Sequence, residues 1–153
     1  MSKDFYSIAV VGFGGMGSYH LKLAEGIDEV RITGSFDIKE DRQELARQKG
    51  LNVYDSFEDL LADESVDIVL VATPNDSHKE IAIRSMEAGK NVVCEKPVTI
   101  SSADLQEMID ASEKTGKLLV VHQNRRWDED FLTMKKIYDE NMLGEVYAIE
   151  SRV

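Results

Sequence analysis

The strongest constraint on the fold is a repeated alternation between short apolar runs and helix-like segments. Runs rich in β-branched residues occur at 7–11, 30–33, 51–54, 67–72, 91–94 and 117–121. Several are apolar at every position, a pattern typical of strands covered on both faces and hence of a parallel sheet. Helical patterns occupy 15–26, 39–49, 56–63, 76–89 and 102–115. Because parallel strands need right-handed crossovers, we predict an α/β fold with a doubly wound parallel sheet.

Length and charge exclude several function classes. A chain of 153 residues makes one ordinary domain, and 18 Lys and Arg against 29 Asp and Glu give a net charge of −11. Nucleic acids and anionic membranes bind proteins through a basic surface, so neither is an expected partner of this acidic chain. The longest apolar runs reach about five residues, against roughly 20 needed to span a bilayer, and no targeting pattern is seen, so we expect a cytoplasmic protein. The single cysteine, Cys94, excludes an internal disulfide and a cysteine-based zinc site, and no metal site is expected.

Residues 12–17 read G-x-G-x-x-G between the first predicted strand and the first predicted helix. Gly12 permits a tight turn, Gly14 lets the backbone approach a pyrophosphate, and Gly17 lets the helix pack close to the sheet, as in Rossmann domains. The anion would sit at the positive end of the helix dipole. The predicted cofactor site also includes Phe13, Gly15 and Met16. A tight turn without a ligand can use glycines too, so that alternative stays open here.

Asp37 ends the second predicted strand, 20 residues after Gly17. A carboxylate at this distance typically accepts hydrogen bonds from the adenosine ribose hydroxyls, and Ile38 follows it in the same predicted site. Its charge would repel a 2′-phosphate, which favours NAD over NADP, although Lys39 and Arg42 soften that exclusion. The alternative is that Asp37 caps the following helix.

The fourth predicted strand ends in short polar residues. Thr73, Pro74 and Asn75 are expected to line the path of the cofactor, because ligands of open α/β sheets bind at the carboxyl ends of strands. Asp76 is a candidate cap for the next helix, and His78 would fall in its first turn. His78 belongs to the predicted site, but a structural hydrogen bond is the more frequent role for such a histidine, since no carboxylate partner is evident at suitable spacing.

The fifth predicted strand ends in Glu95-Lys96-Pro97. A lysine at this place, beside an acid and before a proline, is positioned like a catalytic or cofactor-positioning group. Pro97 restricts Lys96 to extended geometry, which helps to aim the ammonium. The alternative is a solvated Glu–Lys ion pair, worth about 0–1 kcal/mol.

Together these motifs resemble the Gfo/Idh/MocA oxidoreductase family, named for glucose-fructose oxidoreductase, inositol dehydrogenase and a rhizopine-catabolism protein. The matching segments are 12–17, Asp37, 72–74 with His78, 87–92, 95–97 and 123–127. The resemblance implies that Lys96 approaches nicotinamide and substrate and stabilises charge on the reacting hydroxyl, while Glu95 holds Lys96 or the nicotinamide ribose. It also places Asn124 and Arg125 near the nicotinamide. The alternative for Arg126 is a solvated basic turn with Trp127 packed in the core.

Enzymes of this family carry a second α/β domain that supplies a histidine and usually an aspartate to the active site. The resemblance therefore implies a dinucleotide-binding Rossmann domain at 1–123. Residues 124–153 would hold a connecting helix near 128–143 and, at 145–153, the first strand of a truncated substrate domain. We expect that last strand to be frayed or paired with another chain, and this chain alone to bind NAD without turnover.

The favoured function is that of an NAD(P)-dependent oxidoreductase of the sugar or polyol dehydrogenase type. Its partner would be a small sugar or polyol, and the protein would be a homo-oligomer. One alternative is a non-catalytic dinucleotide-binding module or sensor. A methyltransferase can also place a glycine-rich turn before an acidic strand end, but Glu95-Lys96-Pro97 argues against that class.

Overall fold

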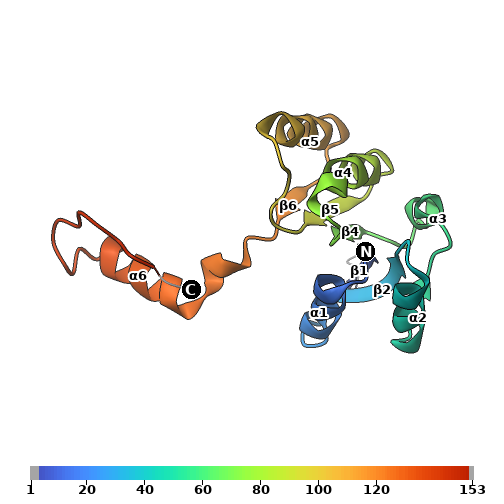
Figure 1. The fold of residues 1–153 in the computed structure, drawn as a ribbon, viewed down its shortest axis with the longest axis horizontal. Coiled ribbons are helices and arrows are strands. Elements are labelled where there is room, and N and C mark those ends of the chain that lie inside the picture. The colour runs from blue at the N-terminus through green and yellow to red at the C-terminus, as the bar shows by residue number, and fades with distance from the viewer. Residues whose placement is uncertain (1–3, 152–153) are drawn as a thin grey trace. The chain divides into compact units, whose positions relative to one another are not determined.

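The computed structural model describes residues 4–151, and its centre is a parallel sheet in the order β3-β2-β1-β4-β5-β6 (Figure 1). The strands are β1 (Tyr6–Val11), β2 (Val30–Phe36), β3 (Asn52–Val53), β4 (Ile68–Val71), β5 (Asn91–Cys94) and β6 (Leu119–Val121). The strand order reverses between β1 and β4, so the crevice at their carboxyl ends is the switch point where such sheets bind ligands. The predicted doubly wound α/β fold is confirmed.

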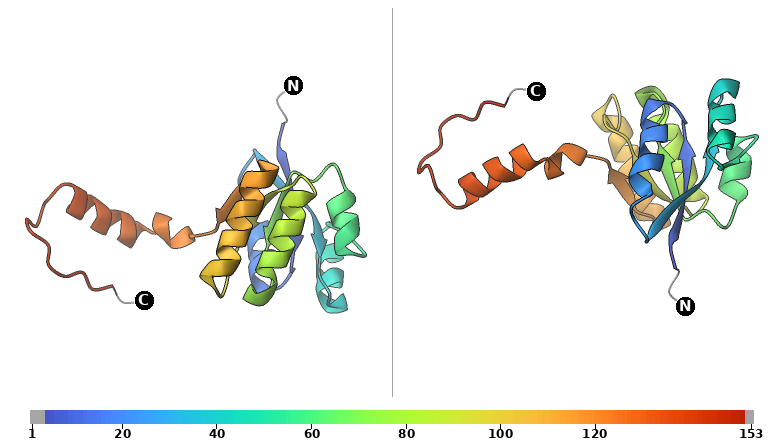
Figure 2. Two further views of the ribbon diagram at one scale, coloured as in Figure 1. Left: turned by 90° about the horizontal axis from the view of Figure 1, so that it is seen from above. Right: turned by 90° about the horizontal axis from the view of Figure 1, so that it is seen from below.

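Helices cover both faces of this sheet (Figure 2). They are α1 (Gly15–Ala24), α2 (Glu40–Gln48), α3 (Phe57–Ala62), α4 (His78–Glu87) and α5 (Ser102–Thr115). One core cluster packs α3, α4 and α5 against the sheet through Leu60, Met86 and Met108. The other packs α1 through Leu21 and α2 through Ala46 around Phe13 of the turn between β1 and α1. Burial on both faces explains why the strand sequences are apolar at successive positions.

Within the described residues, side chains cap the N-termini of α3, at Ser56, and of α5, at Ser101. The Ser101 Oγ accepts a hydrogen bond from the Asp104 N–H at 3.1 Å at the start of α5. The prediction that Asp76 caps α4 is wrong, since Asp76 lies inside a 3₁₀ turn, η1 (Asn75–Ser77). This turn runs directly into α4, and its Asn75 carbonyl accepts a hydrogen bond from the His78 N–H at the start of that helix.

The chain divides into two compact units, Met1–His122 and Gln123–Val153. The second contains a 3₁₀ turn, η2 (Asn124–Trp127), and α6 (Glu129–Asp139). Trp127 is 78% exposed, so the alternative that buries it in a core is wrong. Within residues 4–151, no helix combines the length and the apolar character needed to cross a membrane.

The segment predicted as a terminal strand, 145–153, forms no strand within the described residues of this chain, and its place as the first strand of a second domain stays a prediction. Residues 145–151 form no regular secondary structure, and 152–153 lie outside the described part of the chain. A β-strand is stable only when a neighbouring strand pairs with its N–H and C=O groups, and the described residues of this unit hold no such neighbour. The predicted helix at 128–143 is also shorter, because the chain turns after Asp139 with Asn141 and Gly144 at positive φ.

Candidate functional site

The glycine-rich turn between β1 and α1 combines two crowded positions with one open position. Gly12 has φ +91°, and a Cβ there would lie 2.8 Å from the Ala72 carbonyl oxygen. A Cβ on Gly17 would lie 2.2 Å from the Gly12 carbonyl oxygen. A Cβ on Gly14, in contrast, would meet no atom within 4 Å. Packing therefore requires Gly12 and Gly17, whereas Gly14 borders empty space that a ligand can enter.

The N-terminus of α1 begins beside that empty space. Its N-cap residue is Gly14, so no side chain accepts a hydrogen bond from the first N–H groups, and the first turn carries no acidic residue. Uncapped N–H groups at the positive end of a helix dipole favour an anion. This local positive potential comes from the backbone and does not depend on the net charge of the chain.

A cavity of about 470 Å³ lies at the carboxyl ends of β1, β2 and β4. Six of the residues singled out from the sequence line it: Gly12, Gly14, Asp37, Ile38, Thr73 and Pro74. Its volume falls in the range of cofactor sites, roughly 300–1,000 Å³. The fold thus brings the glycine turn, the acidic end of β2 and the polar end of β4 to one opening at the switch point.

Asp37 stands at the edge of this cavity and is tied to the glycine turn. Its Oδ2 accepts a hydrogen bond from the Phe13 N–H at 2.7 Å, and its Oδ1 accepts one from the Lys39 N–H at 2.9 Å. The N-cap of α2 is Lys39, so the alternative that Asp37 caps this helix is wrong. Lys39 and Arg42 also line the cavity and place positive charge near this carboxylate.

The other residues predicted around the turn occupy different surroundings. The Phe13 side chain is fully buried in the core, so only its backbone faces the site. Gly15 and Met16 open α1, and Met16 is 38% exposed. Asn75 is exposed in η1 and does not line the cavity.

His78 is fully buried and holds two loops together. Its Nε2 lies 2.8 Å from the Thr73 carbonyl oxygen, and its Nδ1 lies 3.1 Å from the Pro97 carbonyl oxygen. The imidazole thus links the loop after β4 to the loop after β5. This is the structural hydrogen-bonding role that the sequence favoured. These hydrogen bonds position Thr73 and the segment that follows Lys96.

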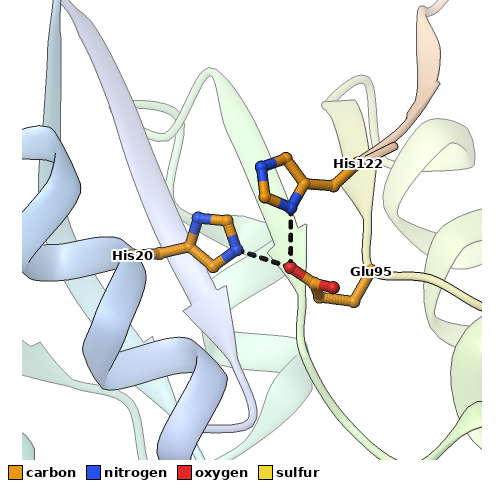
Figure 3. A group of neighbouring side chains, drawn as sticks. All are labelled: His20, Glu95 and His122. Atoms are coloured by element: carbon orange, nitrogen blue, oxygen red, sulfur yellow. Dashed lines mark hydrogen bonds and ion pairs between the residues drawn. The ribbon is translucent and has the colours of Figure 1, made fainter. Parts of the chain in front are cut away.

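Glu95 is buried and is the centre of a cluster in which the two histidines are partly exposed (Figure 3). Its Oε1 accepts hydrogen bonds from His20 Nε2 of α1 at 2.7 Å and from His122 Nδ1, just after β6, at 2.9 Å. Its Oε2 accepts one from the Lys96 N–H at 3.2 Å. Burial alone raises the pKa of Glu95, but the bonds from His20, Lys96 and His122 outweigh it and hold that pKa below its usual value.

The sequence reasoning missed both histidines of this cluster, although a signal for one of them was present. Val121 pairs with Cys94 in the parallel ladder between β5 and β6, so the next residues, His122 and Glu95, must leave the sheet side by side. His20 lies three residues after Gly17 in α1, and only the packing of that helix brings it to Glu95.

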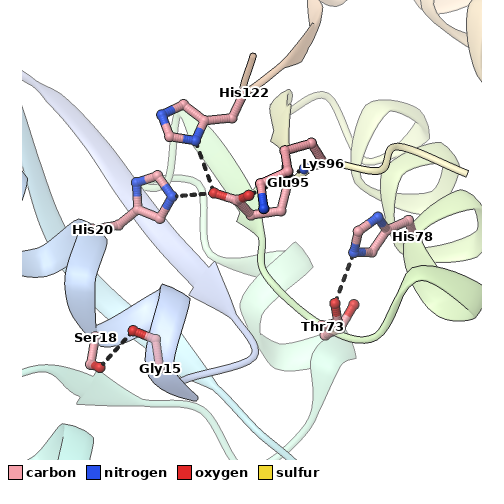
Figure 4. A network of polar contacts seen from close by, with 8 residues as sticks. All are labelled: Gly15, Ser18, His20, Thr73, His78, Glu95, Lys96 and His122. Atoms are coloured by element: carbon pink, nitrogen blue, oxygen red, sulfur yellow. Dashed lines mark hydrogen bonds and ion pairs between the residues drawn. The ribbon is translucent and has the colours of Figure 1, made fainter. Parts of the chain in front are cut away.

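Lys96 follows Glu95 on the exposed side of the same loop (Figure 4). The Glu95 carboxylate pairs with two imidazoles and not with the Lys96 ammonium, so the alternative of a solvated Glu–Lys ion pair is wrong. The Lys96–Pro97 peptide bond is cis. The hydrogen bond from its N–H to Glu95 Oε2 anchors the backbone of Lys96, while the exposed side chain remains available to a ligand.

Asn124 and Arg125 lie in η2, the first element of the second unit. Both are exposed, and the Arg125 guanidinium donates a hydrogen bond to the Asp128 carboxylate at 3.2 Å. Their approach to the nicotinamide stays a prediction.

The lowered pKa of Glu95 predicts a pH-dependent contribution to stability. A carboxylate whose folded pKa lies below its unfolded value of about 4.5 stabilises the fold above that pH, and this contribution is lost as the pH falls through the folded pKa. We expect the free energy of unfolding of the wild type to exceed that of Glu95→Gln by about 1–3 kcal/mol at pH 7. Urea denaturation at pH 7, 5, 4 and 3 should show this difference shrinking below about pH 4.5. A difference that is constant or grows in acid would contradict the assignment.

Comparisons with known proteins agree with this geometry. Residues 6–123 match the family described as "Oxidoreductase family, NAD-binding Rossmann fold". Inositol 2-dehydrogenase of Salmonella typhimurium is 32% identical over 148 residues, which are 94% of this chain and 44% of the relative. The scyllo-inositol 2-dehydrogenase (NADP(+)) of Bacillus subtilis is 34% identical over 146 residues, 94% of this chain and 40% of the relative.

Solved structures lead to the same family. The crystal structure of an NAD-binding protein from Listeria innocua is 55% identical, with a TM-score of 0.90, and the match covers 94% of this chain and 42% of that one. The chain thus spans less than half the length of these three relatives. The family match covers most of the chain and includes the glycine turn, Asp37 and the Glu95-Lys96-Pro97 segment. The chain therefore belongs to the Gfo/Idh/MocA family of oxidoreductases and contains its NAD-binding Rossmann fold.

Proposed function

We propose that this chain binds NAD in the cavity at the switch point, as the cofactor-binding part of a sugar or polyol dehydrogenase. The observation that carries the proposal is the uncapped N-terminus of α1, which lies beside open space at Gly14 and faces the same cavity as Asp37. An anion-binding helix end and an acceptor for hydroxyl groups in one cavity are what a dinucleotide requires.

Each part of the cavity has a separate task in this proposal. The N–H groups at the start of α1 hold the pyrophosphate, and Asp37 accepts hydrogen bonds from the adenosine ribose. Thr73 and Pro74 line the path beyond the turn, while His78 keeps the loop after β4 in place. When bound, NAD supplies the nicotinamide carbon that exchanges a hydride with substrate.

Lys96 is the proposed catalytic residue of this chain. Glu95 anchors its backbone, and its ammonium would stabilise negative charge on the oxygen of the reacting hydroxyl. The names of the inositol dehydrogenases among the relatives support a polyol as the substrate class. The remainder of the active site, the homo-oligomeric state and the cytoplasmic location stay predictions for the whole protein.

Cofactor titrations of the chain test the first part of the proposal. Quenching of protein fluorescence should report saturable binding of NADH, weaker binding of NADPH and none of S-adenosylmethionine. Failure of both nicotinamide cofactors to bind would overturn the proposed site. A screen of the whole protein over polyols and sugars then separates a dehydrogenase from a non-catalytic binding module, which would bind NADH without turnover.

Asp37 should control the choice between the two nicotinamide cofactors. Hydrogen bonds to a charged group contribute about 1.5–3 kcal/mol, so we expect Asp37→Ser to weaken NADH binding by about tenfold or more. NADPH affinity should fall much less or rise, because the repulsion of the 2′-phosphate is removed while Lys39 and Arg42 remain. Calorimetry with both cofactors measures the ratio.

The matched control for this variant is Asp76→Asn, which removes another carboxylate that lines the same cavity. Circular dichroism must confirm that Asp37→Ser keeps its fold, because Asp37 also accepts the Phe13 N–H. An unchanged NADH to NADPH ratio in folded Asp37→Ser would contradict the role of this residue.

A further inference from the structure

We propose that His20, Glu95 and His122 bind a divalent transition-metal ion. The three side chains come from α1, the end of β5 and the end of β6, and their candidate ligand atoms all lie within 4.8 Å of one another (Figure 3). Nothing in the sequence predicted a metal site here, because the three residues are far apart along the chain.

The donor set suits borderline metal ions. Two imidazole nitrogens and one carboxylate oxygen are typical ligands of Zn²⁺, Co²⁺ and Ni²⁺, whereas Mg²⁺ and Ca²⁺ prefer oxygen ligands alone. Zinc–ligand distances of about 2.0–2.1 Å in tetrahedral geometry place neighbouring ligand atoms roughly 3.3 Å apart. The two imidazole nitrogens now lie 2.7 and 2.9 Å from Glu95 Oε1, so a side-chain shift of about half an ångström makes room for the ion. On binding, the proton on each of these nitrogens moves to the other nitrogen of its ring or is released to solvent, which frees the lone pair for the metal.

The surroundings of the cluster support a bound cation. Glu95 is buried, so a divalent ion would find a carboxylate that is already largely removed from water. Glu95 Oε2 already accepts the Lys96 N–H, which fixes the carboxylate from outside the ligand set. A cavity of about 230 Å³, lined in part by His20 and His122, leaves room for a water molecule as a fourth ligand.

Binding of the ion would tie α1 to the ends of β5 and β6, and therefore stabilise the first unit. A ligand that binds only the folded state raises the free energy of unfolding of the protein by an amount that grows with the ligand concentration. The proposal does not rest on NAD binding or on turnover, so it can fail while the proposed function stands.

The experiment uses the untagged chain, because a polyhistidine tag would bind the same ions. Calorimetry with Zn²⁺ should show one saturable site, and Co²⁺ should add visible absorption bands of a four- or five-coordinate ion. His20→Ala, His122→Ala and Glu95→Gln should each weaken binding by about tenfold or more, since each loses a ligand or its charge. Glu64→Gln, an exposed carboxylate elsewhere, is the matched control and should change nothing.

Nuclear magnetic resonance of the wild-type histidines supplies a test that needs no variant. Zn²⁺ should shift the His20 Nε2 and His122 Nδ1 resonances and leave His78 unchanged, because His78 is held by backbone carbonyls elsewhere. The absence of a saturable Zn²⁺ site, or equal affinity in folded variants of the cluster, would overturn the proposal. So would resonance shifts confined to groups outside the cluster.

Discussion

A Gly17→Ala variant is expected to lose about 3 kcal/mol of its free energy of unfolding. The added Cβ would lie 2.2 Å from the Gly12 carbonyl oxygen and 3.1 Å from a Val10 methyl group, so α1 would have to move away from the sheet. Overpacking of this kind typically costs 1–3 kcal/mol, and here the obstacle is backbone, which cannot rotate aside. Urea denaturation followed by circular dichroism measures the loss.

Two neighbouring glycines separate packing from ligand binding. A Cβ on Gly14 or on Gly26 would meet no atom within 4 Å, so neither alanine variant is overpacked. Gly26→Ala should keep the stability of the wild type within about 0.5 kcal/mol, and Gly14→Ala should lose no more than about 1 kcal/mol, because alanine is a poorer N-cap than glycine. Gly14→Ala should nevertheless weaken NADH binding by at least about tenfold, because its methyl group occupies the space proposed for the pyrophosphate. Gly26→Ala should bind NADH normally. Normal NADH affinity in Gly14→Ala would show that the pyrophosphate lies elsewhere.

A Lys96→Ala variant of the whole protein is expected to lose about 10²–10³ in turnover. Removing one preorganised group that stabilises a developing oxyanion has this effect in enzymes generally. NADH affinity should stay within about threefold, because the proposed pyrophosphate and ribose contacts come from the glycine turn and Asp37. Steady-state kinetics with the best polyol of the screen, together with NADH titration of the same variant, measures the two effects separately.

Two further variants sharpen the test of Lys96. Lys96→Met keeps the apolar stem without the charge and should be as inactive as Lys96→Ala. Lys114→Ala removes an exposed lysine of α5 and should retain full turnover. Wild-type turnover in Lys96→Ala would assign the catalytic charge to another residue.

Glu95 links the proposed catalytic residue, Lys96, to the proposed metal ligands His20 and His122. Its carboxylate anchors the backbone of Lys96 while it accepts hydrogen bonds from two imidazoles. Disturbing the cluster, whether by Glu95→Gln or by a bound metal ion, should therefore act on Lys96 through its backbone. Turnover would therefore mix the effect of the metal ion with the effect on Lys96. The metal experiment instead measures the affinity for the ion and the histidine resonances.

Local patterns were sufficient for much of the fold. Successive apolar residues mark strands covered on both faces, and Gly12 to Gly17 mark a tight strand-to-helix turn, because both depend on neighbours within one βα unit. Strand ends were less predictable. The last residues of β2, Gly34 to Phe36, are held by pairing with β1 on one side and partly with β3 on the other, and their own composition gives little sign of it.

The sequence was least informative where a remote partner, or the lack of one, decides the outcome. Residues 145–151 have the β-branched and aromatic content of a strand, yet they form none because no neighbouring strand pairs with them in this unit. Asp76 is a good capping residue by type, but it lies inside the 3₁₀ turn whose Asn75 carbonyl accepts the His78 N–H at the start of α4.

The sequence by itself determined a doubly wound sheet, through the alternation of strands and helices. Its G-x-G-x-x-G motif and Asp37 also determined a glycine turn and an acidic residue at the switch point. These features follow from hydrophobic periodicity and backbone conformation, which depend on residues that are close together in the sequence. Only the tertiary structure decided that His20 and His122 meet at Glu95 and that Glu95 holds Lys96 by its backbone. The physical reason is that these contacts depend on the register of β6 against β5 and on the close packing of α1 that Gly17 permits.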